Sequence, residues 1–402
     1  MGHIEDRWRR AGRKGTGRRW RVRYLDPAGR ERSRSFDRKV DAERFLVQVA
    51  AEVQRGTWID PAKARTTLRR QAADRLEGYH RDSSRAEKIR QHLDLHILPA
   101  LGDYTLGQLA QRPSLISQFM ASLPMSAGSA EQVYITLASI LDAAVDDGLI
   151  ARNPAKAQTV KRPRAPKRKV VPWTAGQVAE MREGMPTCWR AAIDCGSGLG
   201  LRGGEIFGLG PDEVDFLRRT VHVGRQIKRM GGRVWFAAPK GGRDRDVPLP
   251  QPVALRLSSH IAEFPPVPVT LPWHEPGNER RHGRPVTVEL MFASRQRGAI
   301  NPSTFNTTAW RPARRAAGIV VSGQGSGVGL HALRHYYASV LLAGGVDVRA
   351  LSEYLGHHDP GFTLRVYAHL VPSAEGRALR AIEAAFADAD GPVTAQEGGN
   401  AP

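Results

Sequence analysis

The chain has 402 residues, of which 41% are hydrophobic, and 60 Lys and Arg against 40 Asp and Glu give it a formal net charge of +20. This length predicts two or three domains with their own cores, and the sequence has no apolar run long enough to span a membrane. Charges without a following apolar stretch at the N-terminus argue against a secretory signal, so the expected location is the cytoplasm. The basic excess favours a polyanionic partner, of which nucleic acid is the commonest.

Residues 1–58 are predicted to form a small DNA-binding module. They contain 16 Lys and Arg and 8 Asp and Glu, a net charge of 16 − 8 = +8. Apolar and basic side chains alternate with the period of a strand: Trp20, Val22 and Tyr24 against Arg19, Arg21 and Arg23. A turn at 27–29, a partner strand in ERSRSF and a helix over about 40–54 complete the unit. Such a basic ribbon can lie in a DNA groove, and the plainer alternative is a ββα fold with a charged outer face.

Residues 64–158 are predicted to form an all-helical domain. Its best-formed helix, about 129–147, carries an amphipathic core stripe. The stripe consists of Val133, Leu137, Ile140, Leu141, Ala144 and Val145. Gly148 ends this helix, and the Asn153-Pro154 pair marks a boundary.

Segment 159–171 is predicted to be an exposed linker, because it combines prolines with positive charge. From 161 to 169, six of nine residues are basic and none is acidic. These six are Lys161, Arg162, Arg164, Lys167, Arg168 and Lys169. A basic linker can lie across DNA while the domains grip opposite sides, so we expect these residues to contact phosphates.

Residues 172–385 are predicted to form a third, mainly α-helical domain with a small β-sheet, and residues 386–402 a disordered tail. Within the third domain, the Pro- and charge-rich segment 262–286 is expected to be a surface insertion. Cys188 and Cys195 form no CxxC or zinc-ligand pattern and are expected to be buried thiols. The predicted fold class is a multidomain α+β protein with a small N-terminal sheet-plus-helix domain and a helical middle domain.

Six polar residues in the C-terminal half suit chemistry at a phosphodiester. In chain order they are Arg202 in GLGLRGGE, Lys240 in APKGGRD, His331 and Arg334 in HALRH, His357 in LGHHDP and Tyr367 in LRVYAH. Each arginine can bind two phosphate oxygens and stays charged. Tyrosine is a weak nucleophile with a pKa of about 10, so cationic groups must offset the charge of the phosphate that it attacks. A lysine at a tight turn between two strands could protonate a leaving 5′ oxygen.

Each of these residues also has a plainer interpretation. Alone, Lys240 is more simply a solvated turn lysine and Tyr367 a half-buried core tyrosine, and only the ordered set favours a catalytic site. His331 and Arg334 share one helix face, where His331 could accept the tyrosine proton or orient the phosphate. His335 is expected to point elsewhere and to be structural.

Two other kinds of site are disfavoured. His357 and His358 are adjacent, but adjacent side chains diverge and no carboxylate cluster joins them, so a metal site is not expected. The glycine pattern from Gly198 to Gly203 fits a dinucleotide fingerprint. No clear strand precedes that pattern, and no acid follows at the interval that a ribose-binding carboxylate needs.

On these residues the chain resembles the tyrosine recombinases, specifically phage-type or mobile-element integrases. The resemblance implies that Tyr367 is the nucleophile of an active site formed by the other five residues, with Glu205 of RGGE in support. It also implies an arm-type DNA-binding domain at 1–58, a core-binding domain at 64–158 and a catalytic domain at 172–385.

The resemblance further implies a reaction without cofactors. Tyr367 would attack the scissile phosphate, form a 3′-phosphotyrosyl bond and release a 5′ hydroxyl. Another strand's 5′ hydroxyl would reverse the step, with a Holliday junction between the two exchanges. The covalent intermediate keeps the bond energy, so neither ATP nor a metal ion is required.

The implied partners are double-stranded attachment-site DNA and further copies of the chain in a homotetramer. A C-terminal helix at about 373–385 would dock on a neighbouring copy, and a host DNA-bending protein and an excision factor are left open. Alternatives are a housekeeping tyrosine recombinase, a type IB topoisomerase and a DNA-binding regulator without cleavage. The arm-like module at 1–58 argues against the first two.

Overall fold

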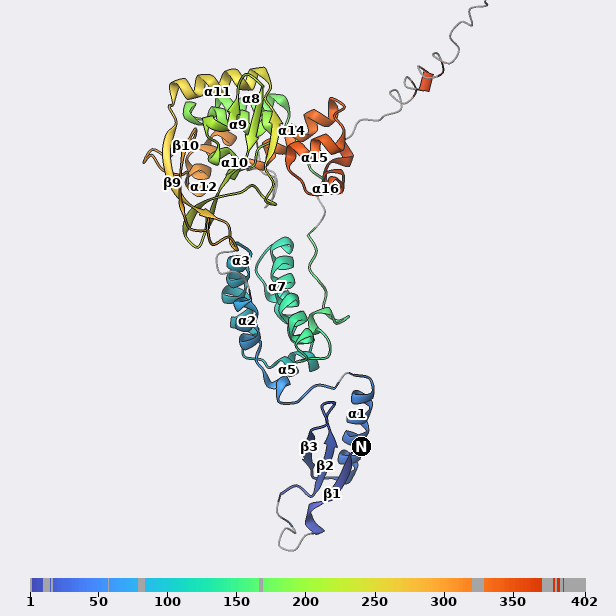
Figure 1. Ribbon diagram of the computed structural model, residues 1–402. Helices are drawn as coiled ribbons and strands as arrows, with labels where there is room; N and C mark the ends of the chain where they lie inside the picture. Colours follow the sequence, from blue (N-terminus) through green and yellow to red (C-terminus); the bar gives the residue numbers. More distant parts are fainter. Residues whose placement is uncertain are drawn as a thin grey trace, which may run out of the picture. The chain divides into compact units, whose positions relative to one another are not determined.

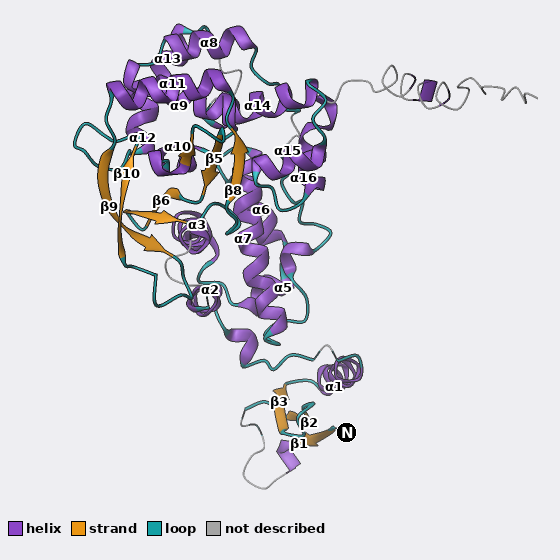
Figure 2. Cartoon of the chain, turned by 45° about the horizontal axis from the view of Figure 1, so that its top comes forward, coloured by secondary structure: helices purple, strands orange, loops and turns teal. Residues whose placement is uncertain are grey.

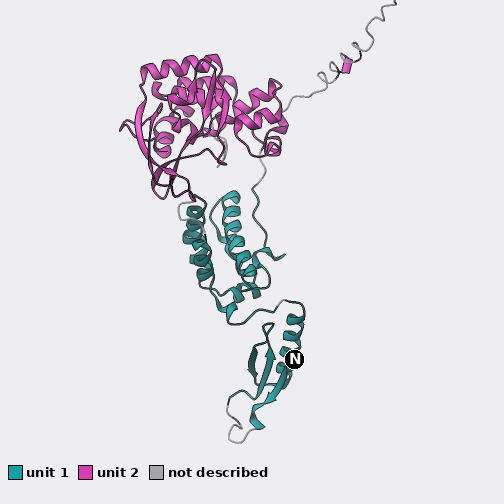
Figure 3. Ribbon diagram, in the orientation of Figure 1, with its two compact units in different colours: residues 1–167 teal, residues 168–402 magenta. Residues whose placement is uncertain are grey.

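Two compact units, residues 1–167 and 168–402, make up the chain in the computed structural model (Figures 1 and 3). The structure describes residues 2–9, 15, 17–56, 58–78, 84–165, 169–319, 329–370, 379, 382, 383 and 386. None of the helices in these ranges has the length and apolar character that a membrane span needs. The predicted tail beyond Phe386 and most of the predicted helix at 373–385 lie outside the described residues.

The first unit begins with a three-stranded antiparallel sheet in the order β1-β2-β3, packed against one helix. These elements are β1 (His3–Asp6), β2 (Trp20–Leu25), β3 (Glu31–Phe36) and α1 (Lys39–Gln54). Val22 and Tyr24 are buried in a small core with Ala42 and Val49 of α1. Because side chains alternate along a strand, the arginines between them point to the other face of the sheet. The predicted strands and helix are present, and β1 is an additional strand that the sequence did not predict.

Six helices form a separate core in the first unit. They are α2 (Leu68–Glu77), α3 (Ser84–His92), α4 (Leu98–Leu101), α5 (Leu106–Gln111), α6 (Ser114–Ser122) and α7 (Ala127–Asp146). The side chain of Ser126 caps α7 by accepting a hydrogen bond from the Ser129 N–H. Val133, Leu137 and Leu141 of α7 are buried in this core, so the stripe predicted at 129–147 is confirmed as a core face.

The predicted linker 159–171 spans the boundary between the two units. Its first residues pack with the helices of the first unit, since Val160 is buried there and Ser117 Oγ donates a hydrogen bond to the Thr159 carbonyl. Residues 161–165 are mainly exposed, and 166–168 lie outside the described residues. The proposed division into arm-type, core-binding and catalytic domains stays a prediction.

The second unit is built around helix α9 (Thr187–Leu199), most of which is buried. The other helices are α8 (Ala175–Glu183), α10 (Gly203–Gly208), α11 (Gln251–Glu263), α12 (Pro302–Phe305), α13 (Arg311–Ala316), α14 (His331–Ala343), α15 (Val348–Leu355) and α16 (Pro360–Tyr367). Glycines let two of these helices approach α9 closely. A Cβ atom at Gly196 would lie 2.7 Å from Leu333 of α14, and one at Gly198 would lie 2.5 Å from Val253 of α11.

In the described part of the second unit, the strands form two sheets (Figure 2). They are β4 (Val214–Asp215), β5 (Thr220–Val223), β6 (Gln226–Met230), β7 (Arg233–Ala237), β8 (Arg245–Pro248), β9 (Val267–His274) and β10 (Pro285–Leu290). One sheet has the order β4-β5-β8, and the other has the order β10-β9-β7-β6. The predicted multidomain α+β fold class is confirmed, with two sheets in place of one.

The segment 262–286 is not the surface insertion that the sequence predicts. Its first residues end α11, and β9 then pairs with β10 on one side and with β7 on the other. Prolines led to the wrong prediction because they cannot donate a hydrogen bond within a sheet. Pro268 and Pro272 are tolerated in β9, since its pairing with β7 is limited to the later residues Trp273 and His274.

Replacing Gly200 by alanine is expected to destabilise the second unit. Gly200 ends α9 with φ = 65°, and a Cβ atom there would collide with the ring of Tyr337. The left-handed backbone costs a non-glycine residue about 1–2 kcal/mol, and forced overpacking adds about 1–3 kcal/mol. Guanidinium unfolding followed by tryptophan fluorescence measures the loss.

Gly318→Ala is the matched control, because Gly318 has φ = 62° and a Cβ atom there would meet nothing within 4 Å among the described residues. It is expected to show the backbone cost alone. Equal unfolding midpoints for the two variants would contradict the packing argument.

Candidate active site

The six candidate residues come from five places in the second unit. Arg202 is the residue before α10, Lys240 lies between β7 and β8, His331 and Arg334 lie on α14, His357 follows α15, and Tyr367 ends α16. α9 also precedes the glycine-rich turn before Arg202, so a helix stands where a dinucleotide fingerprint requires a strand.

The guanidinium groups of Arg202 and Arg334 meet at the carboxyl end of α15. Arg202 Nη2 donates to the carbonyl oxygens of Leu355 and Gly356, at 3.1 Å each. Arg334 Nη2 donates to the same Leu355 oxygen, and its Nη1 donates to the Gly200 oxygen at 2.7 Å. The last carbonyls of a helix lack intrahelical partners and carry partial negative charge, so they suit guanidinium groups. This helix end therefore holds two like charges side by side.

Arg334 is fully buried, which is rare for an arginine. Burial, and then the charge of Arg202, lower the pKa of Arg334 to about 9, so the group remains charged at neutral pH. Its Nε is buried and has no hydrogen-bond partner in the described part of the chain. The site thus keeps positive charge with an unused donor.

Glu205 holds Arg202 in place, and a residue that the sequence did not single out holds Glu205. Glu205 accepts from Arg202 Nη1 and from the Arg202 N–H, both at 2.8 Å. Arg245 of β8 donates to both Glu205 oxygens, at 3.2 and 2.8 Å, and to the Tyr354 carbonyl at 2.7 Å. Burial alone would raise the pKa of Glu205, but Arg245 and then Arg202 outweigh it and hold that pKa at about 2. Glu205 is therefore an anion that orients the site arginines.

The ring of His357 is fixed by bonds at both nitrogens. Its Nε2 lies 3.1 Å from Arg334 Nη2, and its Nδ1 lies 2.7 Å from Thr363 Oγ1. Because a guanidinium can only donate, Nε2 accepts and the hydrogen of the neutral ring sits on Nδ1. Burial, and then Arg334 and Arg202, lower the pKa of His357 to about 3, so the ring is neutral.

Tyr367 lies in the same site, and its hydroxyl contacts His335. Tyr367 is 2% exposed, and its Oη lies 2.8 Å from His335 Nδ1. Burial raises the pKa of Tyr367, and the charges of Arg334 and Arg202 offset part of that rise. The expectation that His335 points away from the site is wrong. The HALRH sequence predicts the helical spacing of these residues, but it does not show that α16 packs beside α14 and brings Tyr367 to His335.

His331 and Lys240 lie on the open side of the site, where both are exposed. Loss of hydration, and then the charges of Arg334, Arg202 and Lys240, lower the pKa of His331. The lysine is therefore close enough for its charge to act on the histidine. Gly241 and Gly242 follow with φ = 96° and 74°, which is the tight turn that the sequence predicts.

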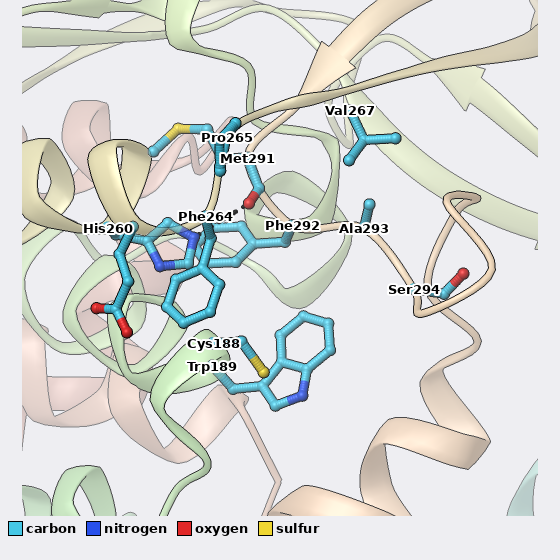
Figure 4. Close-up of a pocket in the computed structure, with 11 residues that line it drawn as sticks. Cys188, Trp189, His260, Phe264, Pro265, Val267, Met291, Phe292, Ala293 and Ser294 are labelled. Carbon is cyan, nitrogen blue, oxygen red and sulfur yellow. Dashed lines mark hydrogen bonds between the residues drawn. The ribbon is translucent and has the colours of Figure 1, made fainter.

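A separate cavity of about 260 Å³ lies near α9 and α11 (Figure 4). Phe264, Met291 and Phe292 line it, and His260 Nε2 bonds there to the Met291 carbonyl. None of the six candidates lines this cavity. In the described residues, no three His, Cys, Asp or Glu side chains gather as metal ligands.

The three arginines of the first unit that are predicted to contact DNA differ in whether they form ion pairs within the protein. Arg19 is paired with Asp6 at 2.9 Å, and Arg23 with Glu5 at 3.3 Å and Glu31 at 2.7 Å. Arg21 has no ion-pair partner among the described residues.

In the basic segment, Arg162 pairs with Glu131 at 2.9 Å. Lys161 and Arg164, like Lys169 in the second unit, are exposed. Lys167 and Arg168 lie outside the described residues.

Two family models match the sequence. The model of the phage integrase family matches residues 180–373, which contain all six candidates, and that of the phage integrase N-terminal domain matches residues 11–55. The chain belongs to the phage integrase family of tyrosine recombinases. These matches confirm the resemblance to tyrosine recombinases that the sequence motifs indicated. As a member of this family, the protein is a site-specific recombinase.

Relatives of this integrase match along most of their length. A prophage phiRv2 integrase of Mycobacterium tuberculosis is 25% identical over 371 residues, which are 89% of this chain and 90% of the relative. The tyrosine recombinase XerD of the same species is 26% identical over 296 residues, 71% of this chain and 84% of the relative.

Solved integrase structures share the fold. The Tn1549 transposon integrase in complex with transposon right-end DNA matches with a TM-score of 0.62 and 18% identity, covering 80% of this chain and all of that one. A lambda integrase tetramer bound to a Holliday junction matches with a TM-score of 0.55 and 18% identity, covering 86% of this chain and 91% of that one.

Replacing Arg245 by alanine is expected to destabilise the integrase. The change would leave the buried Glu205 carboxylate with Arg202 as its remaining ion-pair partner, and removing one member of a buried pair costs about 3–5 kcal/mol. Chemical unfolding of the full chain measures the change, and Arg243→Ala, an exposed arginine before β8, is the control.

The pH dependence of stability gives a second measurement. A carboxyl with a pKa of about 2 contributes stability that is present above its ordinary pKa of 4.5 and is lost as pH falls toward 2. Arg245→Ala should raise the Glu205 pKa and move this loss to higher pH. If the loss of stability at low pH occurred at the same pH in the variant and the wild type, Arg245 would not set the charge of Glu205.

Proposed function

We propose that this integrase cuts and rejoins DNA through a 3′-phosphotyrosyl bond to Tyr367 and thereby integrates or excises a phage or other mobile element. One observation carries the proposal: a buried tyrosine hydroxyl lies in the same site as two guanidinium groups that share the Leu355 carbonyl. Without those cations, the negative charge of a phosphodiester would repel the nucleophile. We place the reaction in the cytoplasm, on nucleoid DNA.

The chain's own residues have distinct tasks in this mechanism. Arg202 and Arg334 bind the non-bridging oxygens of the scissile phosphate and offset the charge that grows in the transition state; a positioned arginine contributes about 10³–10⁵ in rate in other phosphoryl transfers. The neutral ring of His331 can donate a hydrogen bond to the phosphate, and His357 positions Arg334 by accepting a hydrogen bond from its Nη2. Glu205 holds Arg202 at the site.

The leaving group requires a proton. Lys240 lies at an exposed turn between two strands, and its charge acts on His331 at the mouth of the site. From there, its ammonium protonates the departing 5′ oxygen. The phosphotyrosyl bond keeps the energy of the broken bond, so the partner strand's 5′ hydroxyl can reverse the step without ATP.

The first unit reads the DNA around the cut. The face of its sheet that carries Arg19, Arg21 and Arg23 is proposed to bind distant arm-type sites, and the helices α2–α7 to bind the core site. The basic residues Lys161, Arg162, Arg164, Lys167, Arg168 and Lys169 would contact DNA phosphates. By analogy with the lambda integrase tetramer on a Holliday junction, we propose a homotetramer on paired attachment sites. A host DNA-bending protein and an excisionase are its proposed accessory partners.

Tyr367→Phe is expected to abolish the covalent step and leave DNA binding intact, because phenylalanine keeps the ring in its buried position without the hydroxyl. The measurement uses attachment-site DNA with a nick beside the scissile phosphate, which traps the wild-type protein as an adduct stable to SDS. Tyr104→Phe, on the first unit, is the control.

The outcomes of this experiment separate the alternatives. A regulator without cleavage would give no adduct even with the wild-type protein, and this result would refute the proposal. Efficient relaxation of a supercoiled plasmid that lacks the attachment site would favour a type IB topoisomerase.

Arg21→Ala is expected to weaken DNA binding more than a change on the opposite face of the sheet. Each lost phosphate contact reduces the slope of log K against log salt by about 1. Titrations of an attachment-region fragment at several salt concentrations measure it. Arg44→Ala, an exposed arginine on α1, is the matched control, and equal slopes for both variants would argue against DNA contact by the open face.

A further inference from the structure

The hydroxyl of Tyr367 is held by a histidine on a neighbouring helix. His335 Nδ1 lies 2.8 Å from Tyr367 Oη, and the two rings meet edge to face with their centroids 5.6 Å apart. His335 follows Arg334 directly on α14. The helix that supplies a phosphate-binding guanidinium therefore also supplies the contact to the nucleophile.

The direction of this hydrogen bond follows from burial. Because Tyr367 is 2% exposed, its proton needs an acceptor within the protein. In the described part of the chain, the structure gives Tyr367 Oη one hydrogen-bond partner, His335 Nδ1. A hydrogen on Nδ1 would leave the phenol proton without an acceptor. The phenol therefore donates to Nδ1, and the ring hydrogen sits on Nε2.

The charge state of His335 agrees with this assignment. Burial, and then the neighbouring His331 and Arg334, lower the pKa of His335 to about 4. At neutral pH the ring is therefore uncharged, and its Nδ1 lone pair is available to the phenol.

His331 contacts the ring of His335, which in turn contacts the nucleophile Tyr367. Its ring centroid is 4.6 Å from that of His335, with the planes at 79°, and its side chain is exposed. Among the described residues, no hydrogen bond joins His331 to Tyr367. This position suits contact with a bound phosphate better than removal of the buried phenol proton.

We propose that His335 is the general base that removes the proton of Tyr367 during DNA cleavage, an inference that rests on the proposed role of Tyr367 as the nucleophile. As Oη bonds to phosphorus and the bond from phosphorus to O5′ breaks, the phenol proton moves to His335 Nδ1. The 5′ oxygen takes a proton from the Lys240 ammonium. When the strands rejoin, the imidazolium returns its proton to Tyr367, and the Lys240 amine takes one from the attacking 5′ hydroxyl.

A weak base is sufficient for this step. The phenol oxygen becomes strongly acidic as it bonds to phosphorus, so the transfer becomes favourable within the transition state. General base catalysis of this kind contributes about 10²–10⁴ in rate.

Two substitutions distinguish a base from a residue that only positions the ring. His335→Ala removes both functions, whereas the amide oxygen of His335→Asn can still accept the phenol hydrogen bond but cannot take the proton. We expect both variants of the full-length protein to form the covalent adduct about 10²–10⁴ times more slowly than the wild type and to bind attachment-site DNA equally well. His358→Asn, an exposed histidine, is the control. Normal cleavage by the asparagine variant would overturn the proposal, since it would show that a hydrogen bond alone is enough.

A substrate with sulfur in place of the bridging 5′ oxygen distinguishes protonation of the leaving group from removal of the tyrosine proton. A thiolate leaves without protonation, so this substrate should rescue Lys240→Ala but not His335→Ala or His335→Asn. Rescue of the His335 variants would place their defect on the leaving-group side and overturn the proposal. The wild-type arm tests the proposed function independently, because a protein without a nucleophilic tyrosine would form no adduct on either substrate.

Discussion

The carbonyl oxygen of Leu355 accepts hydrogen bonds from both Arg202 and Arg334, and the rest of the active site depends on this contact. Two guanidinium groups repel each other, and one of them is fully buried. The negative end of α15 offsets that cost and fixes where both groups lie. Further hydrogen bonds tie other segments to the same groups: the Gly200 carbonyl after α9 accepts from Arg334, and Thr363 of α16 contacts His357.

The local balance of charge explains why such a site would bind a phosphodiester. Arg202 and Arg245 form ion pairs with the carboxylate of Glu205, and the charge of Arg334 lies near it, so positive charge remains after these ion pairs are formed. His335 and His357 stay neutral because burial, and then the neighbouring positive charge, lower their pKa values. An anion that enters the site would therefore meet fixed cations and uncharged rings that can still exchange protons.

Sequence reasoning found the residues whose chemistry is distinctive and missed those whose role depends on packing. The sequence predicts Arg202, His331, Arg334 and Tyr367 as site residues, because few types of side chain suit chemistry at a phosphate and these four occur in a characteristic order. His335 could not be recognised, since a helix position does not show which helix packs beside it. Arg245 was one arginine among many in a basic chain, and its value comes from a buried carboxylate 40 residues away in the sequence. The sequence did not predict strand β9, because prolines disfavour a strand and the sequence does not show on which side and over which residues β9 pairs.

Arg245 has a mechanical consequence for the lysine that precedes it. Its bonds to Glu205 and Tyr354 anchor the start of β8 to the arginine site, while the glycine turn before it stays exposed. Arg245 lies five positions after Lys240 in the sequence, and an extended chain reaches roughly 3.6 Å per residue. The backbone of Lys240 can therefore lie at most about 18 Å from this anchor, so the bonds of Arg245 limit the range over which the exposed lysine can move.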